Sequence, residues 1–251
     1  MRAWVLEEFG GPLVRRDVPV PTIAPYEVLV RVRSVGICGT DLNIHAGHMG
    51  LSVLPLIMGQ EVAGEVAEVG SQVHGVQPGD RVAVNFYVTC GRCQFCRVGR
   101  DTLCADVRQH GFSMDGGFAE YLKTPAVNLC AVPANVPLER ACILSDVVAT
   151  SYHAMTKRAH IRPGQTVAIV GVGGGGCTLC RWPDWPVPGS LLLTSMRPGL
   201  NWPQSLVPMR LWTRVRAHFT RPYAGLLTIR GWTLCSNSSP IRRRYHPVTG
   251  V

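Results

Sequence analysis

The stretch Cys90-Gly91-Arg92-Cys93-Gln94-Phe95-Cys96, with Cys104 after seven intervening residues, decides how this part of the chain folds. Three thiols at two-residue gaps and a fourth just beyond can converge on one point as a compact loop folds around it. Four thiolates at about 2.3 Å form the closed tetrahedral set typical of structural zinc. Gly91 and Gly99 supply the backbone freedom that such a loop needs. We therefore predict a structural zinc lobe over about residues 86–106.

A disulfide pair and an iron–sulfur cluster are the alternatives for four such cysteines. The N-terminus, Met1 to Glu8, has acids where an export signal needs an apolar stretch. Ten cysteines in a chain without an export signal favour reduced thiols and metal. No segment is long and apolar enough to span a bilayer. These features favour zinc over disulfides and predict a cytoplasmic protein with no membrane partner.

The net charge of +9 at pH 7 would fit a nucleic-acid-binding protein. The charge is confined to one end of the chain. Residues 177–251 contain ten arginines, no lysine and one acid, Asp184, whereas residues 1–176 contain 15 basic and 15 acidic residues. The arginines begin where patterned sequence stops and have no scaffold, so we expect no nucleic-acid partner.

Residues 1–150 have the pattern of a mainly β domain. Apolar and polar residues alternate with the period of half-buried strands in Glu27 to Val35 and in Val62 to Val69, where Gly64 and Gly70 mark bends or bulges. The turn Gln77-Pro78-Gly79-Asp80 precedes a further strand, Arg81 to Val84. Many short strands separated by glycine and proline predict a small barrel-like domain.

The spacing of the apolar residues along the sequence changes after residue 137. Leu138 to Met155 has helical content, and Thr166 to Val170 is a short apolar run typical of a strand buried on both faces. Glycines at 171, 173, 174, 175 and 176 follow. In a dinucleotide site Gly171 permits the tight turn, Gly173 the approach of the pyrophosphate, and Gly176 close packing of helix on strand. Such a loop is weak evidence alone, but its place after a buried strand predicts the start of an α/β Rossmann domain that binds NAD or NADP.

The sequence beyond the glycine loop does not continue this pattern. Prolines 183, 186 and 188 stand where a helix should run, and Leu191-Leu192-Leu193 is an isolated apolar stretch. Positions 190–205 hold no acid to bind the adenosine ribose, so NAD and NADP cannot be told apart. We hypothesise that residues 177–251 are an irregular tail produced by truncation or a frameshift. A genuine basic, disordered extension is the alternative.

Two further motifs lie before the cysteine loop: Gly36-Ile37-Cys38-Gly39-Thr40-Asp41 and Gly59-Gln60-Glu61-Val62-Ala63-Gly64. With these motifs the chain resembles the zinc-dependent medium-chain alcohol dehydrogenases. The family signature is Gly-His-Glu, two residues, Gly, five residues, Gly, two residues, Val. It is matched at Gly59, Glu61, Gly64, Gly70 and Val73, and Gln60 replaces the histidine.

The resemblance covers residues 1–176. It implies a GroES-like catalytic domain over residues 1–150, which includes the zinc lobe. It also implies that residues 151–176 form a linker helix and the first Rossmann strand with its glycine loop.

The resemblance also implies a catalytic zinc. Cys38 would be its first ligand, Gln60 stands at the second position, and Asp146 resembles the third, with Glu61 as a nearby carboxylate. An amide oxygen is a far weaker zinc donor than imidazole. The centre is therefore weakened, rescued by Glu61, or empty. Taken alone, Cys38 would be read as a buried core thiol, but its place in the matched motif favours a metal ligand.

Proton transfer and cofactor contacts follow from the same resemblance. Zinc acts as a Lewis acid on the alcohol oxygen, and Thr40 resembles the hydroxyl that accepts the alcohol proton. Asn43 stands where many relatives have a relay histidine. His45 could substitute for it, although a surface histidine is an equal alternative. Thr150 resembles a residue near the nicotinamide.

The predicted function is that of a zinc-dependent alcohol or polyol dehydrogenase, which transfers hydride from a small alcohol or polyol to NAD(P). We expect the activity to be impaired in this chain, because its Rossmann part is incomplete. The alternative is a non-catalytic GroES-like module held by structural zinc. The family implies a homo-oligomer.

Overall fold

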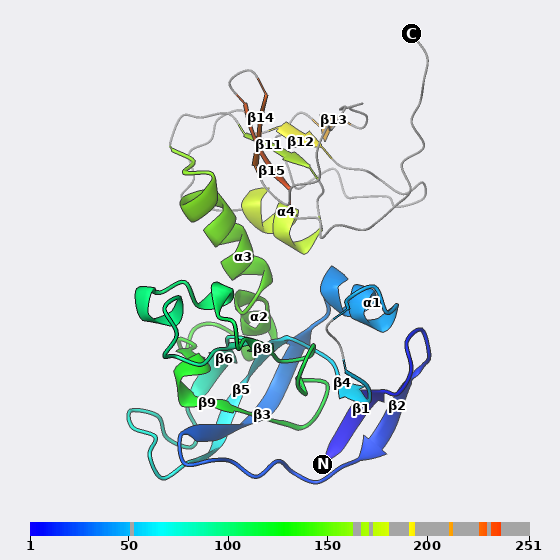
Figure 1. Ribbon diagram of the computed structural model, residues 1–251, viewed down its shortest axis with the longest axis vertical. Helices are drawn as coiled ribbons and strands as arrows, with labels where there is room; N and C mark the ends of the chain where they lie inside the picture. Colours follow the sequence, from blue (N-terminus) through cyan, green and yellow to red (C-terminus); the bar gives the residue numbers. More distant parts are fainter. Residues whose placement is uncertain are drawn as a thin grey trace. The chain divides into compact units, whose positions relative to one another are not determined.

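The computed structural model describes residues 1–50, 53–162, 167–170, 173–180, 191–193, 211–212, 226–229 and 232–236. The chain divides into two compact units, Met1–Ala149 and Thr150–Val251 (Figure 1). In the part of the chain that the structure describes, no helix has the length and apolar character needed to cross a bilayer.

The first unit contains two antiparallel sheets and a two-stranded ribbon. One sheet has the order β2-β1-β4 and is formed by β1 (Arg2–Leu6), β2 (Leu13–Asp17) and β4 (Leu56–Ile57). The other has the order β10-β6-β5-β3-β9 and is formed by β3 (Glu27–Gly36), β5 (Glu61–Val69), β6 (Arg81–Val84), β9 (Tyr121–Pro125) and β10 (Leu129–Ala131). The ribbon pairs β7 (Tyr87–Val88) with β8 (Arg108–Gln109). The mainly β prediction is confirmed: the two strands predicted from alternation are β3 and β5, and the strand predicted after the turn at residues 77–80 is β6.

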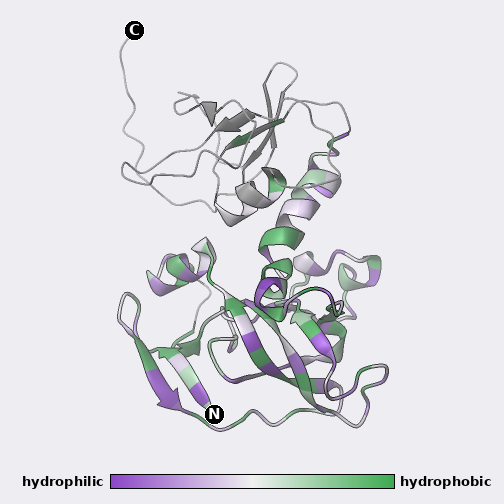
Figure 2. Ribbon diagram, turned by 180° about the vertical axis from the view of Figure 1, so that it is seen from behind, coloured by the Kyte–Doolittle hydropathy of each residue, from purple (hydrophilic) through white to green (hydrophobic). Residues whose placement is uncertain are grey.

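The alternation of β5 and β6 builds a core on each face of the larger sheet. Val62 and Val84 belong to a cluster of valines and leucine, whereas the adjacent Ala63 and Ala83 pack with Leu138. Successive side chains of a strand point to opposite faces, so the small alanines leave room for a helix on their face. Figure 2 shows hydrophobic and hydrophilic residues alternating along the strands of this sheet.

Short helices complete the first unit. They are α1 (Gly39–His45), the 3-10 turns η1 (Cys96–Val98), η2 (Asp101–Leu103) and η3 (Ala126–Asn128), then α2 (Leu138–Ala141) and the 3-10 turn η4 (Cys142–Leu144). The helix α3 (Val147–His153) follows and passes from the first unit into the second. The helical prediction for Leu138 to Met155 is thus confirmed as a series of short helices.

The second unit has its own sheet. Its described elements are the π-helix η5 (Ala154–Arg158), β11 (Val167–Val170), α4 (Gly174–Cys180), β12 (Leu191–Leu193), β13 (Leu211–Trp212), β14 (Leu226–Ile229) and β15 (Trp232–Ser236). The sheet order is β13-β12-β11-β15-β14, and β11 runs parallel to both of its neighbours. The predicted buried strand at 166–170 is confirmed as β11.

Two expectations for the region after the glycine loop are wrong. A helix is present: α4 begins at Gly174, within the glycine run, and ends at Cys180, three residues before Pro183. Leu191–Leu193 is not isolated, because Leu191 pairs with Ala168 of β11. A short apolar segment acquires strand structure from its partner, which no local pattern reveals. Most of the tail for which we hypothesised truncation or a frameshift lies outside the described residues.

Candidate metal centres

The sulfur atoms of Cys90, Cys93, Cys96 and Cys104 all lie within 4.8 Å of one another. The distance between the Sγ atoms of Cys93 and Cys96 is 3.5 Å, and that between Cys90 and Cys96 is 4.0 Å. In a tetrahedron of thiolates about 2.3 Å from zinc, neighbouring sulfur atoms are about 3.8 Å apart. Among the described residues, no other group of three or more cysteine, histidine or acidic side chains gathers this closely. The four thiols therefore fit a structural zinc.

The backbone of the lobe brings these thiols together. Gly91 and Gly99 both have φ of 68°, the left-handed conformation that glycine adopts at low cost, and Gly99 ends η1. The Cys93 N–H donates to Cys90 Sγ at 3.3 Å, and the Cys90 N–H donates to Cys104 Sγ at 3.5 Å.

These backbone donors favour the thiolate form that zinc binds. Hydrogen bonding by the backbone of Cys96 is the main cause that lowers the pKa of Cys93 to about 6. The backbone N–H groups of Arg92 and Cys93 also lower the pKa of Cys90. Burial instead raises the pKa of Cys96 to about 11, so metal binding must displace its proton.

Cys38 is held at the start of α1 by a capping box. Its Sγ accepts the Thr40 N–H at 3.3 Å, and its own N–H donates to Asp41 Oδ2 at 2.9 Å. Asp41 is 3% exposed, and burial raises its pKa. This role of Asp41 was not predicted from the sequence, although Cys38 and Asp41 have the Ncap-to-N3 spacing of a capping box. The reciprocal bonds fix the thiol and place the half-buried Thr40 beside it.

Gln60, immediately before β5, joins two of the predicted zinc ligands. Its Nε2 donates to Cys38 Sγ at 3.3 Å and to Asp146 Oδ2 at 2.5 Å. Asp146 immediately precedes α3, so the structure brings together side chains from three distant segments of the first unit. The resemblance implied this convergence, but local sequence patterns did not.

The orientation of the Gln60 amide determines whether the centre fits zinc. Among the described residues, two buried side-chain oxygens lack a hydrogen-bond partner: Gln60 Oε1 and Asp41 Oδ1. The oxygen is the amide's acceptor, and its NH₂ group is only a donor. Here the donor faces Cys38 and Asp146. Burial also raises the pKa of Cys38 to about 11, which favours the thiol that zinc does not bind. As arranged, this donor set does not fit zinc.

Glu61 bonds to the backbone of Val147 and not to the other predicted zinc ligands. Its Oε1 accepts the Val147 N–H at 2.9 Å, which ties β5 to the first residue of α3. Its Oε2 fills the space beside Gly36, where an added Cβ would lie 2.1 Å from that oxygen. This requirement for glycine at position 36 has no signal in the local sequence, because it depends on a side chain 25 residues away in the chain. Burial raises the pKa of Glu61 to about 7, the Val147 N–H opposes that shift, and Asp146 and Asp41 add to it.

The remaining predicted site residues are spread over both units. His45, in the last turn of α1, donates from Nε2 to the Gly11 carbonyl at 2.7 Å. Thr150 lies on α3 and is exposed. In the second unit, Gly173 precedes α4 and Gly176 lies within it, whereas Gly171 is outside the described residues. The buried Ser151 hydroxyl donates to the Gly175 carbonyl at 3.1 Å, which links α3 to α4.

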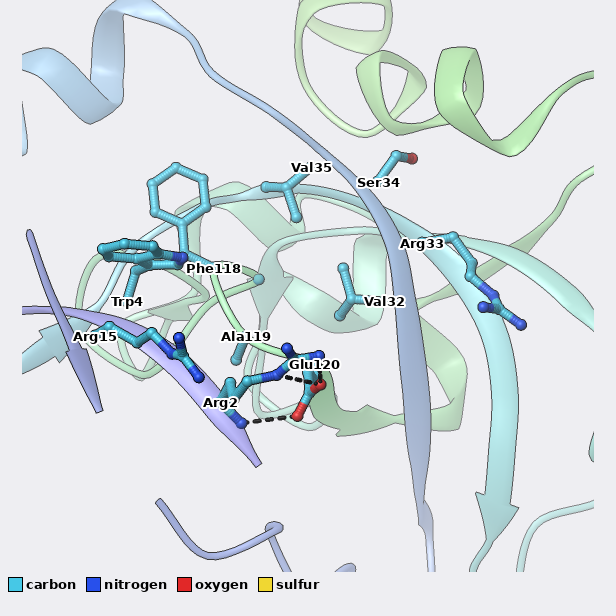
Figure 3. A pocket seen from close by; sticks show the side chains of 11 residues that line it. Arg2, Trp4, Arg15, Val32, Arg33, Ser34, Val35, Phe118, Ala119 and Glu120 are labelled. Carbon is cyan, nitrogen blue, oxygen red and sulfur yellow. Dashed lines mark hydrogen bonds and ion pairs between the residues drawn. The ribbon is translucent and has the colours of Figure 1, made fainter. Parts of the chain in front are cut away.

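A separate cavity of about 420 Å³ lies beside β1 and β3 (Figure 3). On one side Arg2 pairs with Glu120, its Nε donating to Oε1 at 2.8 Å. Trp4, Arg15 and Phe118 line it as well. None of the predicted site residues is among those that line it, so this cavity is distinct from both candidate centres.

Comparison with known proteins places the first unit in a family. The sequence profile of the alcohol dehydrogenase GroES-like domain matches residues 24–134. Alcohol dehydrogenase 1 of Emericella nidulans is 42% identical over 175 residues, which are 69% of this chain and 50% of that protein. Sorbitol dehydrogenase of Bacillus subtilis is 38% identical over 185 residues, which are 72% of this chain and 52% of that protein.

Solved structures of dehydrogenases superpose on this chain as well. A zinc-binding dehydrogenase from Sinorhizobium meliloti bound to NADP superposes with a TM-score of 0.72 at 33% identity, covering 78% of this chain and 56% of that one. A cobalt- and zinc-bound alcohol dehydrogenase from Pyrobaculum aerophilum gives 0.71 at 33% identity, covering 77% and 59%. The chain spans about half the length of the curated relatives that it matches. Through its GroES-like domain, the chain belongs to the zinc-dependent medium-chain alcohol dehydrogenase family.

Proposed function

We propose that this chain is an alcohol or polyol dehydrogenase of impaired activity, whose reaction is hydride transfer from a small alcohol or polyol to NAD or NADP. The observation that carries the proposal is the convergence of Cys38, Gln60 and Asp146, in a unit that also contains the cysteine lobe. The names of its relatives, alcohol dehydrogenase and sorbitol dehydrogenase, support this substrate class.

In this proposal Cys90, Cys93, Cys96 and Cys104 hold the structural zinc. The metal supplies cross-linking to a lobe whose remaining residues are mostly exposed or half-buried and cannot form a core of their own. These four cysteines are free thiols, which the proposed site requires and which a reducing compartment such as the cytoplasm would maintain. A homo-oligomer remains our proposal from the family.

Thr40 is the proposed acceptor of the alcohol proton. Its backbone position is fixed by the capping box at Cys38, and its side chain is half-buried beside that thiol. His45 is the proposed relay from Thr40 to solvent. Because its Nε2 donates to the Gly11 carbonyl, a relay would use the opposite ring nitrogen, Nδ1.

Gly171, Gly173, Gly176 and Thr150 are the proposed cofactor-binding residues. We expect weak cofactor binding, because the described strands of the second unit have only two to five residues and α4 has seven. Such short strands give little support for a dinucleotide site. Turnover by this chain should therefore be slow.

A non-catalytic zinc module is the second candidate. It is favoured by the Gln60 amide, which presents hydrogen-bond donors to two of the three predicted ligands of the catalytic zinc. In that case the lobe would bind zinc while no alcohol would be oxidised.

The two candidates are separated by assaying the purified chain with a panel of alcohols and polyols in excess NAD or NADP. We expect alcohol-dependent reduction at least about 100-fold below a typical turnover of about 10 s⁻¹, lost in Thr40→Ala. Cofactor titration by fluorescence should show weak binding. Micromolar cofactor affinity with ordinary turnover would contradict the impairment, and a complete lack of reduction would favour the module.

Zinc analysis of the same preparations tests the lobe. Cys93→Ser should remove the tightly bound zinc, because a hydroxyl does not replace the thiolate. Cys130→Ser is the matched control: Cys130 is an exposed cysteine on β10 and should leave the zinc content unchanged. Retention of zinc in Cys93→Ser would refute the four-thiolate site.

A further inference from the structure

The end group of Gln60 lies between the two side chains that the family resemblance assigns to the catalytic zinc. We propose that the Gln60 amide takes the place of that metal in this chain, links Cys38 to Asp146 by hydrogen bonds, and keeps zinc out of the centre. The inference rests on the proposed function for the identity of the site and deepens it, because a centre without zinc lacks the Lewis acid for the alcohol oxygen and lowers the expected turnover further. The catalytic centre could be weakened by Gln60, rescued by Glu61, or empty, and the inference selects the empty centre.

The hydrogen bonds use the whole donor capacity of the amide. A side-chain NH₂ group has two N–H bonds, and Nε2 of Gln60 makes one contact to Cys38 Sγ at 3.3 Å and one to Asp146 Oδ2 at 2.5 Å. A zinc bound to both atoms would lie about 2.3 Å from the sulfur and about 2.1 Å from the oxygen. It would need the space that these two N–H groups now face. The amide and the metal therefore exclude each other.

The amide must turn end over end before it can offer a ligand to zinc. Its nitrogen cannot bind a cation, and its oxygen makes no hydrogen bond to any described residue. Turning it breaks both hydrogen bonds, one of them a short bond to a carboxylate, and such charge-assisted bonds are the stronger kind. Imidazole meets no such obstacle, because its unprotonated nitrogen is itself a zinc donor.

Burial of Gln60 and the existing contacts of Glu61 limit the other ways of satisfying the centre. Gln60 is 2% exposed, as are its neighbours Met58 and Glu61. Water therefore reaches the Gln60 amide poorly, although Cys38 and Asp146 are themselves half-buried. Glu61 is not placed to serve as the missing ligand, since its Oε1 is bonded to the Val147 N–H and its Oε2 packs beside Gly36.

The test is the zinc content of the full-length chain and of Gln60→His and Gln60→Glu, each dialysed after saturation with zinc. We expect one zinc per chain in the parent, held by the cysteine lobe, and two in each variant. Histidine supplies a nitrogen donor. Glutamate has the shape of glutamine but no hydrogen to donate, so with Cys38 and Asp146 it forms a set of acceptors that needs a cation. Gln72→His, at an exposed glutamine, is the control and should keep one zinc.

Replacing zinc with cobalt(II) locates the second metal. A centre with one thiolate should add absorption bands distinct from those of the four-thiolate lobe in Gln60→His, and these bands should vanish in Gln60→His combined with Cys38→Ser. Circular dichroism and thermal unfolding confirm that each variant is folded.

Two zincs in the parent chain would overturn the inference, and so would folded Gln60→His and Gln60→Glu variants that both stay at one. Neither readout uses cofactor or alcohol. A chain that fails to oxidise alcohols would thus defeat the proposed function and leave this inference standing. A second zinc in the parent chain would overturn this inference and leave the proposed function standing.

Discussion

Gln60 and Glu61 are consecutive buried side chains with different partners. Gln60 bonds to Cys38 and Asp146, whereas Glu61 bonds to the Val147 backbone. The two contacts join the start of β5 to the segment that begins α3. A buried carboxylate without a cation is costly in its charged form, and this cost should appear in the pH dependence of stability.

We predict that Glu61→Gln reduces the loss of stability between pH 5 and pH 8. The folded-state pKa of Glu61 is about 7 against an ordinary 4.5, so over this interval the folded chain holds a proton that the unfolded chain has lost. Stability therefore falls as pH rises through the interval and levels off above about pH 7. The neutral amide does not titrate, and its oxygen can still accept the Val147 N–H.

The measurement is urea unfolding of both proteins at pH 5 and pH 8. Relative to the parent, Glu61→Gln should gain roughly 1–3 kcal/mol between the two pH values. Asp41, whose pKa is also raised, and the zinc lobe are present in both proteins, so their own contributions cancel; the part of the Asp41 titration that is coupled to the Glu61 charge belongs to the measured difference. Equal slopes for the two proteins would show that Glu61 ionises freely in the folded chain.

The pairing of β3 with β5 depends on a glycine. Gly64 lies opposite Val32, next to a register shift between Val32 and Ser34. A Cβ at Gly64 would lie 2.2 Å from the Arg31 carbonyl oxygen. Backbone atoms cannot rotate away as a flexible side chain can, so the two strands would have to separate.

We therefore predict that Gly64→Ala destabilises the first unit by about 1–3 kcal/mol, the usual cost of overpacking. Gly50→Ala is the control, because an added Cβ there meets no atom within 4 Å, and it should stay within about 0.5 kcal/mol of the parent. Chemical unfolding monitored by circular dichroism measures both. Equal stabilities of the two variants would mean that β3 and β5 tolerate a wider spacing.

Each hydrophobic cluster of the described residues lies within one of the two units. Four of them lie within Met1–Ala149, and the fifth, around Met155 and Ile169, lies within Thr150–Val251. The zinc lobe also belongs to the first unit. The first unit thus contains both its own core and its own metal site.

We predict that a polypeptide of residues 1–153, which ends with α3, folds and binds its structural zinc. It should unfold cooperatively and contain one zinc per chain. Dispersed amide resonances and metal analysis test this, and the metal-free polypeptide, prepared with a chelator, is the comparison. Aggregation or a broad, non-cooperative transition of the zinc-bound form would show that the first unit needs residues beyond 153.

Sequence alone determined the features that depend on local periodicity and spacing. Alternation predicted β3 and β5, the turn at residues 77–80 predicted β6, and the spacing of four cysteines predicted the lobe, because each signal lies within a short stretch of the chain. Only the tertiary structure decided that the Gln60 amide directs its donors to Cys38 and Asp146 and that Glu61 bonds to Val147. It also decided that Leu191–Leu193 pairs with β11. The physical reason is that these contacts join segments far apart in the chain, and the orientation of a buried polar group depends on the partners that folding brings to it.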